Sequence, residues 1–90
     1  MEIIFKIEAL SDLKYWKRSG NVAVQKRITT LLKEISESPY IGKGKPEQLK
    51  YDLTGYWSRR INAEHRIVYK VYESEETVEI HSLRGHYSDK

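Results

Sequence analysis

Residues 56–72 read YWSRRINAEHRIVYKVY, and this stretch decides the fold that we predict. Two runs rich in β-branched and aromatic residues, 56–61 and 66–72, are separated by NAEH, a length that suits a β-hairpin. A third run of this kind, TVEIHSL at 77–83, follows the polar residues ESEE. The second half of the chain is therefore predicted to be an antiparallel meander of three strands.

The alternation of side chains along a strand sorts this hairpin into two faces. Ile67, Tyr69 and Val71 form the better set for packing beneath helices. Arg66 then falls on the open face of the sheet. Arg60 joins it there if the register of the hairpin permits, because a slip of one residue would turn every side chain over.

The first half of the chain predicts one strand and two helices. Between Asn21 and Pro39, an apolar stripe repeats at helical spacing: Val24, Ile28, Leu31, Leu32 and Ile35. We expect Asn21 to cap this helix and Pro39 to end it. An earlier helix is expected with Ser11 as its cap, or already helical from Glu8, and residues 3–7 are expected to form a strand.

Ninety residues, with 39% hydrophobic and 32% charged side chains, indicate one folded domain spanning residues 1–90. Residues 40–50, YIGKGKPEQLK, contain two glycines and a proline and are expected to form a loop. The order strand, helix, helix, then three strands predicts an α+β domain with its helices on one face of a mainly antiparallel sheet.

Several classes of protein are disfavoured by what the sequence lacks. It has no cysteine and therefore no disulfide framework, and it has no apolar run long enough to span a membrane. Its first residues do not resemble a signal peptide, so we expect a cytoplasmic protein. GKGKP is not followed by Ser or Thr as a P-loop requires, and the histidines lack the spacing of metal ligands. We expect no cofactor and no metal.

The positive charge is concentrated in one part of the chain. Residues 42–70 hold seven basic side chains against three acidic ones, and the net charge of the whole chain is +3. Such an excess favours a polyanionic partner, most often nucleic acid. Arginine suits phosphate because its planar group donates two hydrogen bonds at once. The alternative is an arginine paired across the sheet with Glu79; Lys43 and Lys45 are either phosphate contacts or solvated loop charges.

The ingredients of metal-free RNA cleavage are present as a carboxylate, a permanent cation and a histidine: Glu47, Arg66 and His86. In that reaction a base takes the proton of the 2′-hydroxyl, an acid protonates the departing 5′-oxygen, and a cation stabilises the growing charge. Spacing alone leaves three other residues open for these roles: Glu64, His65 and His81. The residues by themselves indicate a basic RNA-interacting domain with a candidate nuclease site.

Longer stretches resemble a known family. GKGKPEQLKYDLTGYWSRRINAEHRIVY at 42–69, HY at 86–87 and DLKYW at 12–16 resemble the YoeB toxins, also called the Txe type, of the RelE superfamily. The resemblance implies an α+β domain like that of microbial ribonucleases. It also implies an endoribonuclease that cleaves mRNA in the ribosomal A site by metal-free acid–base catalysis.

The resemblance assigns roles to single positions. Glu47 matches the general base, Arg66 the cation that stabilises the transition state, and His86 the general acid. Other residues match groups that hold the substrate, contact RNA or support the site: Tyr87, Lys50 and Arg60. The chain departs from the family at Gly85, where a bulkier residue is expected, and in continuing past HY as residues 88–90.

The family also implies partners: a YefM/Phd-type antitoxin, the ribosome with its mRNA, and a second copy of the toxin in a homodimer. Two other functions stay open at this point. One is a toxin of the related ParE kind, which shares the fold and acts on DNA gyrase. The other is an RNA-binding domain without catalysis, for which Glu47 would be dispensable.

Overall fold

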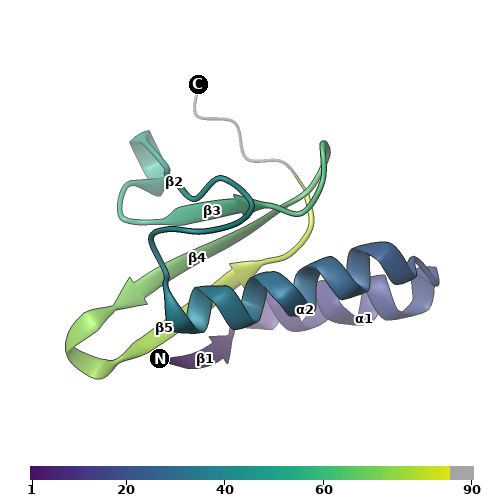
Figure 1. Cartoon of the computed structure of the whole chain (residues 1–90), viewed down its shortest axis with the longest axis horizontal. Coiled ribbons are helices and arrows are strands. Elements are labelled where there is room, and N and C mark those ends of the chain that lie inside the picture. Colours follow the sequence, from purple (N-terminus) through teal and green to yellow (C-terminus); the bar gives the residue numbers. More distant parts are fainter. Residues whose placement is uncertain (86–90) are drawn as a thin grey trace.

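The computed structural model describes residues 1–85. Besides two short 3₁₀ helices, at Tyr51–Leu53 and Glu73–Glu75, these residues form two α-helices and five strands. Their order is β1 (Glu2–Phe5), α1 (Ile7–Ser19), α2 (Val22–Glu37), β2 (Glu47–Gln48), β3 (Trp57–Arg60), β4 (Arg66–Tyr72) and β5 (Thr77–Ser82). The two helices run alongside each other on one side of the sheet (Figure 1). No helix within residues 1–85 is long and apolar enough to cross a membrane.

The five strands form one sheet in the order β1-β5-β4-β3-β2. β1 pairs with β5 in parallel, and the other three pairs are antiparallel. The predicted α+β domain, with an N-terminal strand and two helices on a mainly antiparallel sheet, is therefore confirmed. β1 and β2 occupy opposite edges of the sheet, so residues near 47 lie far from the N-terminal strand.

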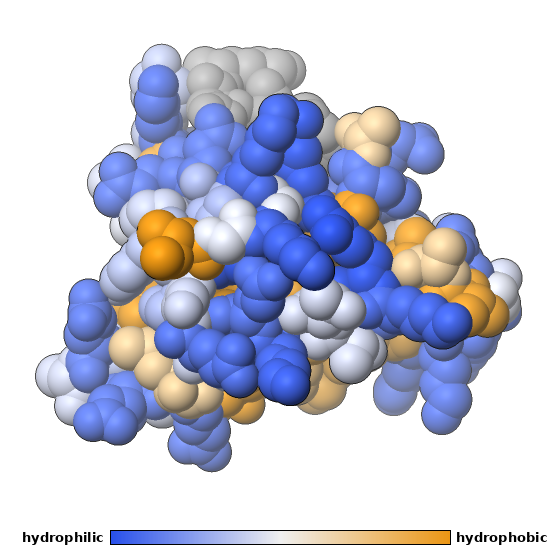
Figure 2. Space-filling view, in the orientation of Figure 1, coloured by the Kyte–Doolittle hydropathy of each residue, from blue (hydrophilic) through white to orange (hydrophobic). Residues whose placement is uncertain are grey.

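The hydrophobic core lies between the helices and one face of the sheet. Ile67 and Tyr69 are fully buried there and Val71 packs against the same cluster, as the alternation along β4 predicts. The stripe on α2 also faces this core, with Leu32 only partly buried at its margin. The side of the molecule seen in Figure 2 is mainly hydrophilic, with apolar residues in separate small patches.

The start of the first helix differs from the prediction. β1 ends at Phe5, and α1 begins at Ile7 after Lys6, whose backbone N–H still donates to the carbonyl of Ile80. Ile7 is 86% exposed rather than part of a strand, and Ser11 lies inside the helix rather than capping it. The alternative prediction, that the helix has already formed before Ser11, is confirmed. Parallel pairing with β5 ends at Phe5, which leaves the chain free to turn there.

The second helix begins as predicted. The side-chain oxygen of Asn21 accepts a hydrogen bond from the Val24 N–H (3.1 Å), and the helix ends at Glu37, two residues before Pro39. This cap satisfies one of the N–H groups that the first turn of a helix leaves without a partner.

Replacing Asn21 with alanine is expected to lower the free energy of unfolding by about 1 kcal/mol, because a cap of this kind contributes that much. Urea denaturation would measure it. Thr30→Ala, on an exposed part of the same helix, is the control. Equal stability of Asn21→Ala and wild type would show that the cap is without effect.

The segment predicted as a loop at 40–50 contains a short strand. Glu47 and Gln48 form β2 and pair with Ser58 and Trp57 at the edge of β3. A strand of two residues gives no periodic pattern in the sequence, which explains why the prediction was wrong here. β2 matters because it attaches Glu47 to the sheet.

Candidate active site

Three neighbouring strands bring together a carboxylate, a hydroxyl and a guanidinium on the face of the sheet opposite the helices. Glu47 of β2 lies directly opposite Ser58 of β3, so their side chains share that face. The Arg66 side chain, at the start of β4, reaches both. Its Nη1 donates to Glu47 Oε1 (2.9 Å) and to Ser58 Oγ (3.1 Å).

The ion pair between Glu47 and Arg66 is open to solvent on one side. The Glu47 side chain is 49% exposed, whereas the Arg66 side chain is 12% exposed. The arginine is thus fixed by the sheet, and the carboxylate stands at its rim. A phosphate that arrives from solvent meets a cation already oriented by two hydrogen bonds and a carboxylate within reach of the same cation.

A further cation, Arg60, lies on the same face as this pair. The register places Arg60 directly opposite Arg66, so the two arginines share the open face, as predicted on the condition of this register. The Arg60 backbone N–H donates to the Gly44 carbonyl (2.7 Å), which brings the loop that carries Lys43 and Lys45 to the edge of β3. The side chains of these lysines, of Arg60 and of Lys50 are all exposed.

Arg59, in contrast, faces no external anion. Its side chain is fully buried, and it forms an ion pair with Glu34 (3.3 Å). Its other hydrogen bonds hold the loop after α2 and a core tyrosine through these acceptors: the carbonyls of Ser38, Ile41 and Lys43 and the hydroxyl of Tyr69. In the sequence, Arg59 alternates with Trp57 and Ile61 and so shares their side of β3. This alternation could have indicated its structural role.

Two tyrosines near this loop are held neutral. Burial raises the pKa of Tyr69 above its ordinary value of 10.0, with Arg59 acting in the opposite direction, and its hydroxyl donates to the Pro39 carbonyl (2.6 Å). Burial also raises the pKa of Tyr40, assisted by Glu73, to which the Tyr40 hydroxyl donates (2.8 Å). Both hydroxyls therefore act as hydrogen-bond donors that pack the loop against the sheet.

The carboxylate of Glu34 holds the loop after α2 through contacts with Lys43 and Arg59. The backbone N–H of Lys43 donates to Glu34 Oε1 (2.9 Å) and is the main reason that the pKa of Glu34 lies below its ordinary value of 4.5. The charge of Arg59 acts in the same direction. The ionised carboxylate is thus the form that the fold favours.

The contribution of Glu34 to stability is expected to depend on pH. Because its pKa is lowered on folding, the contribution is present above about pH 4.5 and is lost as the pH falls through the folded value. Glu34→Gln should therefore be less stable than wild type at pH 7, and the difference should shrink towards pH 3. Thermal unfolding of both proteins across this range measures it; a difference that stays constant with pH would contradict the assignment.

The structure separates the residues that the sequence left as rivals. Glu64 is exposed in the β3–β4 turn. Within residues 1–85 its side chain makes no hydrogen bond or ion pair with Arg66. His65 accepts a hydrogen bond through Nδ1 from the Gly85 N–H (2.9 Å). His81 packs against Tyr56, with its Nδ1 buried. Glu79 contacts Lys6 and Tyr72 rather than an arginine.

His86 and Tyr87, the remaining residues of the predicted site, lie outside the described residues. The residue before them, Gly85, has a φ of +94°, a backbone conformation that side chains of L-residues rarely adopt. Both of its backbone polar groups are hydrogen-bonded, the N–H to His65 and the carbonyl to the N–H of Arg66 (3.1 Å). Gly85 is therefore held against the start of β4.

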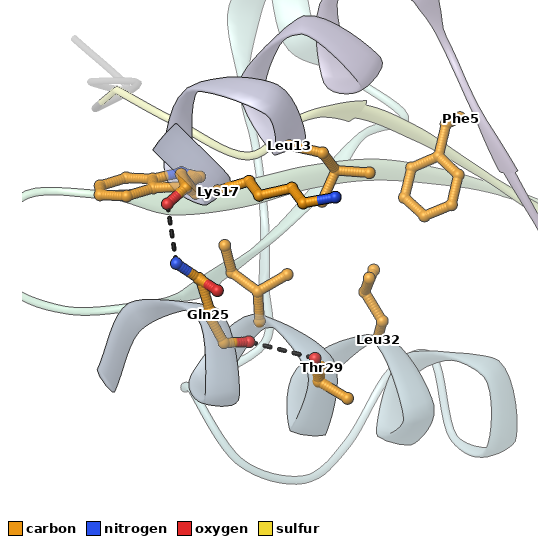
Figure 3. Close-up of a pocket in the computed structure, with 8 residues that line it drawn as sticks. Phe5, Leu13, Lys17, Gln25, Thr29 and Leu32 are labelled. Carbon is orange, nitrogen blue, oxygen red and sulfur yellow. Dashed lines mark hydrogen bonds between the residues drawn. The ribbon is translucent and has the colours of Figure 1, made fainter. Parts of the chain in front are cut away.

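A pocket on the other side of the sheet offers no comparable chemistry. It lies between the two helices and β1 and is lined mainly by apolar side chains, including Phe5, Leu13 and Leu32 (Figure 3). Gln25 spans it by donating to the Trp16 carbonyl (2.9 Å). Among the described residues that line it, Lys17 is the one charged side chain. Within residues 1–85 no cluster of histidine and acidic residues suits a metal ion either.

Comparison with known proteins decides the family. A profile of the YoeB-like toxins of bacterial type II toxin–antitoxin systems matches residues 5–87. The chain belongs to this family. It is 42% identical to the toxin YoeB of Escherichia coli K12 over 97% of this chain and the whole of the relative.

Solved structures agree with the YoeB assignment. The YoeB/ParE toxin from Agrobacterium tumefaciens is 39% identical and superimposes with a TM-score of 0.90 over 97% of this chain and all of that one. A YoeB from Staphylococcus aureus has been solved in a YoeB–YefM complex (44% identity, TM-score 0.83) and as a YoeB dimer (43%, 0.84), each covering 97% of this chain and 98% of theirs. The sequence resemblance to YoeB toxins is thereby confirmed.

Proposed function

We propose that this YoeB-family toxin is an endoribonuclease that cleaves mRNA in the A site of the bacterial ribosome. The observation that carries the proposal is the contact of one guanidinium, on Arg66, with both Glu47 and Ser58 on the open face of the sheet. This places a cation beside a carboxylate that is half exposed to solvent. Metal-free phosphodiester cleavage needs that pairing of charge stabilisation with a base.

In the proposed reaction Glu47 takes the proton of the 2′-hydroxyl, and the resulting oxygen attacks the adjacent phosphorus. The bond from phosphorus to the 5′-oxygen breaks, and His86 gives its proton to that leaving oxygen. The products are a 2′,3′-cyclic phosphate and a 5′-hydroxyl end. Each proton transfer contributes about 10²–10⁴ in rate.

Arg66 has two tasks in this scheme. Before substrate binds, its ion pair holds the Glu47 carboxylate in place at the site. When the phosphate enters, the guanidinium donates to the oxygens on which negative charge develops, and Glu47 is released from the ion pair to act as a base. The arginine is mostly covered and is held by contacts with two neighbouring strands, so little reorganisation is needed in the transition state.

There is a physical reason why cleavage would depend on the ribosome. In the described part of the site, Glu47 is half exposed and the exposed Arg60 lies opposite Arg66 on the same face. Such a surface gives electrostatic attraction to RNA but little control over the position of a flexible strand. A ribosome that holds the mRNA codon in one conformation would supply that positioning, worth several orders of magnitude in rate.

A YefM-type antitoxin is the proposed inhibitor, and the protein is proposed to act in the cytoplasm, where ribosomes are found. The YoeB–YefM complex of the Staphylococcus aureus relative supports the antitoxin. The basic surface around Arg60 favours an acidic segment of a partner that folds as it binds. A homodimer is proposed by analogy with the YoeB dimer of the same relative.

Parallel assays distinguish this function from its alternatives. The toxin is incubated with mRNA alone, with mRNA in ribosomes whose A site is empty, and with DNA gyrase in a supercoiling assay. The proposal predicts cleavage that depends on ribosomes and unchanged supercoiling. Inhibition of gyrase without RNA cleavage would instead favour the ParE-like function, and RNA binding without cleavage would favour a non-catalytic domain.

A further inference from the structure

A second group of side chains lies on the open face of the sheet, beside the candidate active site. On β4, Lys70 follows Arg66 by four positions and so shares its face. Tyr56 precedes Ser58 of β3 by two positions and likewise faces the open side. His81 of β5 completes the group, because its ring meets the Tyr56 ring with centroids 5.2 Å apart. We call Tyr56, Lys70 and His81 the aromatic–lysine cluster.

An irregularity in the pairing of β4 with β5 turns His81 toward this face. Val68 is paired with Ser82. The next residue of β4, Tyr69, is paired with Ile80, so His81 stands opposite no residue. One extra residue in a strand is a β-bulge, and bulges redirect side chains beside active sites. Ile80 belongs to the core, and the bulge lets the ring that follows it lie in the aromatic–lysine cluster instead.

The bulge lowers stability as well as redirecting the ring. His81 Nδ1 and the Oγ of the fully buried Ser82 are both buried, and neither has a hydrogen-bond partner within residues 1–85. Buried polar atoms are nearly always paired, so each unpaired one needs an explanation. Two of them at one bulge, on the face that carries the candidate active site, indicate that the position of the imidazole serves binding rather than stability.

The ammonium of Lys70 is held by aromatic rings rather than by a carboxylate. Its Nζ lies 5.5 Å from the centroid of the Tyr56 ring and 5.3 Å from that of Tyr72, distances at which a cation is attracted to a ring. Glu79 is directly opposite Lys70 in the register, where a cross-strand ion pair is expected. Within residues 1–85, however, Glu79 pairs with Lys6 (4.0 Å), and Lys70 forms no ion pair. Its charge is therefore available to an anion.

The cluster lies within reach of a nucleotide whose phosphate is at Arg66. Two residues along a strand span about 7 Å, and this separates Tyr56 from Ser58, to which Arg66 donates. Single-stranded RNA is bound by rings that stack on its bases together with cations beside its phosphates. The aromatic–lysine cluster supplies both kinds of group, on the face where the scissile phosphate is proposed to bind.

We propose that Tyr56, Lys70 and His81 form a subsite for one nucleotide of single-stranded RNA, next to the phosphate that is cleaved. The base packs against the rings of Tyr56 and His81, and the Lys70 ammonium contacts an adjoining phosphate. The inference rests on the proposed function for the position of the scissile phosphate. It deepens that function by adding three residues that hold the substrate.

The first experiment measures the binding of a short RNA by the full chain without ribosomes. The probe is a single-stranded RNA with methylated 2′-hydroxyls, which cannot be cleaved, and the comparison strand has the same backbone without bases. Fluorescence anisotropy at low ionic strength gives the dissociation constant of each. Wild type should bind the RNA at least about fivefold more tightly than the strand without bases, because one stacked base contributes that much or more. Equal binding of the two strands would overturn the proposal.

Variants separate stacking from charge and from loss of structure. Tyr56→Ala should weaken RNA binding about 5- to 100-fold and leave binding of the strand without bases unchanged, whereas Tyr56→Phe keeps the ring and should match wild type. Lys70→Met removes the charge and should weaken both strands alike. Tyr15→Ala, which removes a tyrosine from α1, is the matched control. If circular dichroism shows that Tyr56→Ala is unfolded, His81→Ala makes the same test.

Two results of this comparison would overturn the proposal. One is an equal loss of both strands, or no loss, in the folded variant without the ring. The other is a wild type that binds an acidic peptide on this face but does not distinguish the two strands, which would assign the aromatic–lysine cluster to a protein partner.

The second experiment places the subsite relative to the cleaved phosphate. Single-turnover cleavage is measured on ribosome-bound mRNA from which one base of the A-site codon is removed at a time. Tyr56→Ala should slow cleavage of the complete codon about 5- to 100-fold and cause no further loss where the base that it contacts is missing. A loss of the same size on every substrate would overturn the proposal while leaving the proposed function in place. If wild type cleaves no mRNA, the proposed function fails, and the binding experiment still decides whether the cluster holds RNA.

Discussion

Arg66→Ala is expected to slow single-turnover cleavage of ribosome-bound mRNA by about 10²–10³-fold, the effect of removing a preorganised donor at developing charge. Binding to the ribosome should change little, because the guanidinium is mostly covered and the exposed cations around it stay in place. The loss should therefore appear in the rate at saturation rather than in the concentration needed for half-saturation.

Two further variants show whether charge or geometry is lost. Arg66→Lys keeps the positive charge but not the planar group that reaches Glu47 and Ser58 together, so it should recover only part of the rate. Lys26→Ala removes a cation from the exposed side of α2 and should behave like wild type. Equal activity of Arg66→Ala and Lys26→Ala would show that Arg66 has no special part in the reaction.

Arg59→Ala is expected to be the most destabilising of the single changes considered. It would leave three loop carbonyls and the partly exposed Glu34 carboxylate without their common donor, and each buried acceptor left unsatisfied costs about 1–3 kcal/mol. For a domain of this size that loss lowers the melting temperature by well over about 10 °C. Thermal unfolding followed by circular dichroism would measure it.

Arg60→Ala, one position along the strand, is the matched control because its side chain is exposed. It should unfold within a few degrees of wild type while weakening the attraction to RNA. Similar melting temperatures for the two alanine variants would contradict the structural role of Arg59. The two alanine variants thus distinguish the roles of two neighbouring arginines that look equivalent in the sequence.

The sequence predicted those features that depend on local periodicity. Alternation along 66–72 identified Ile67 and Tyr69 as core residues and put Arg66 on the open face, and the helical stripe marked α2. These signals are strong because each repeats over several residues with one side buried. The direct pairing of Arg60 with Arg66 needed the register, which the four residues NAEH between the strands leave undetermined.

Features that depend on contacts distant in sequence were not predictable in the same way. Asp12 is one of many acidic residues in the chain, and nothing near it in the sequence indicates that it meets Leu83 across the fold. β2 is too short to show a pattern, although it is what places Glu47. The proposed catalytic set came from resemblance to a family, and the register of three strands places Glu47 and Arg66 within it.

The central claim is tested most directly by primer extension on mRNA in ribosome complexes with a defined, empty A site, with wild type beside Glu47→Ala. We predict a cut within the A-site codon for wild type that is lost with Glu47→Ala, although both proteins are folded and bind the ribosome. No cut by folded wild-type protein on active ribosomes, or an equal cut by Glu47→Ala, would contradict the account.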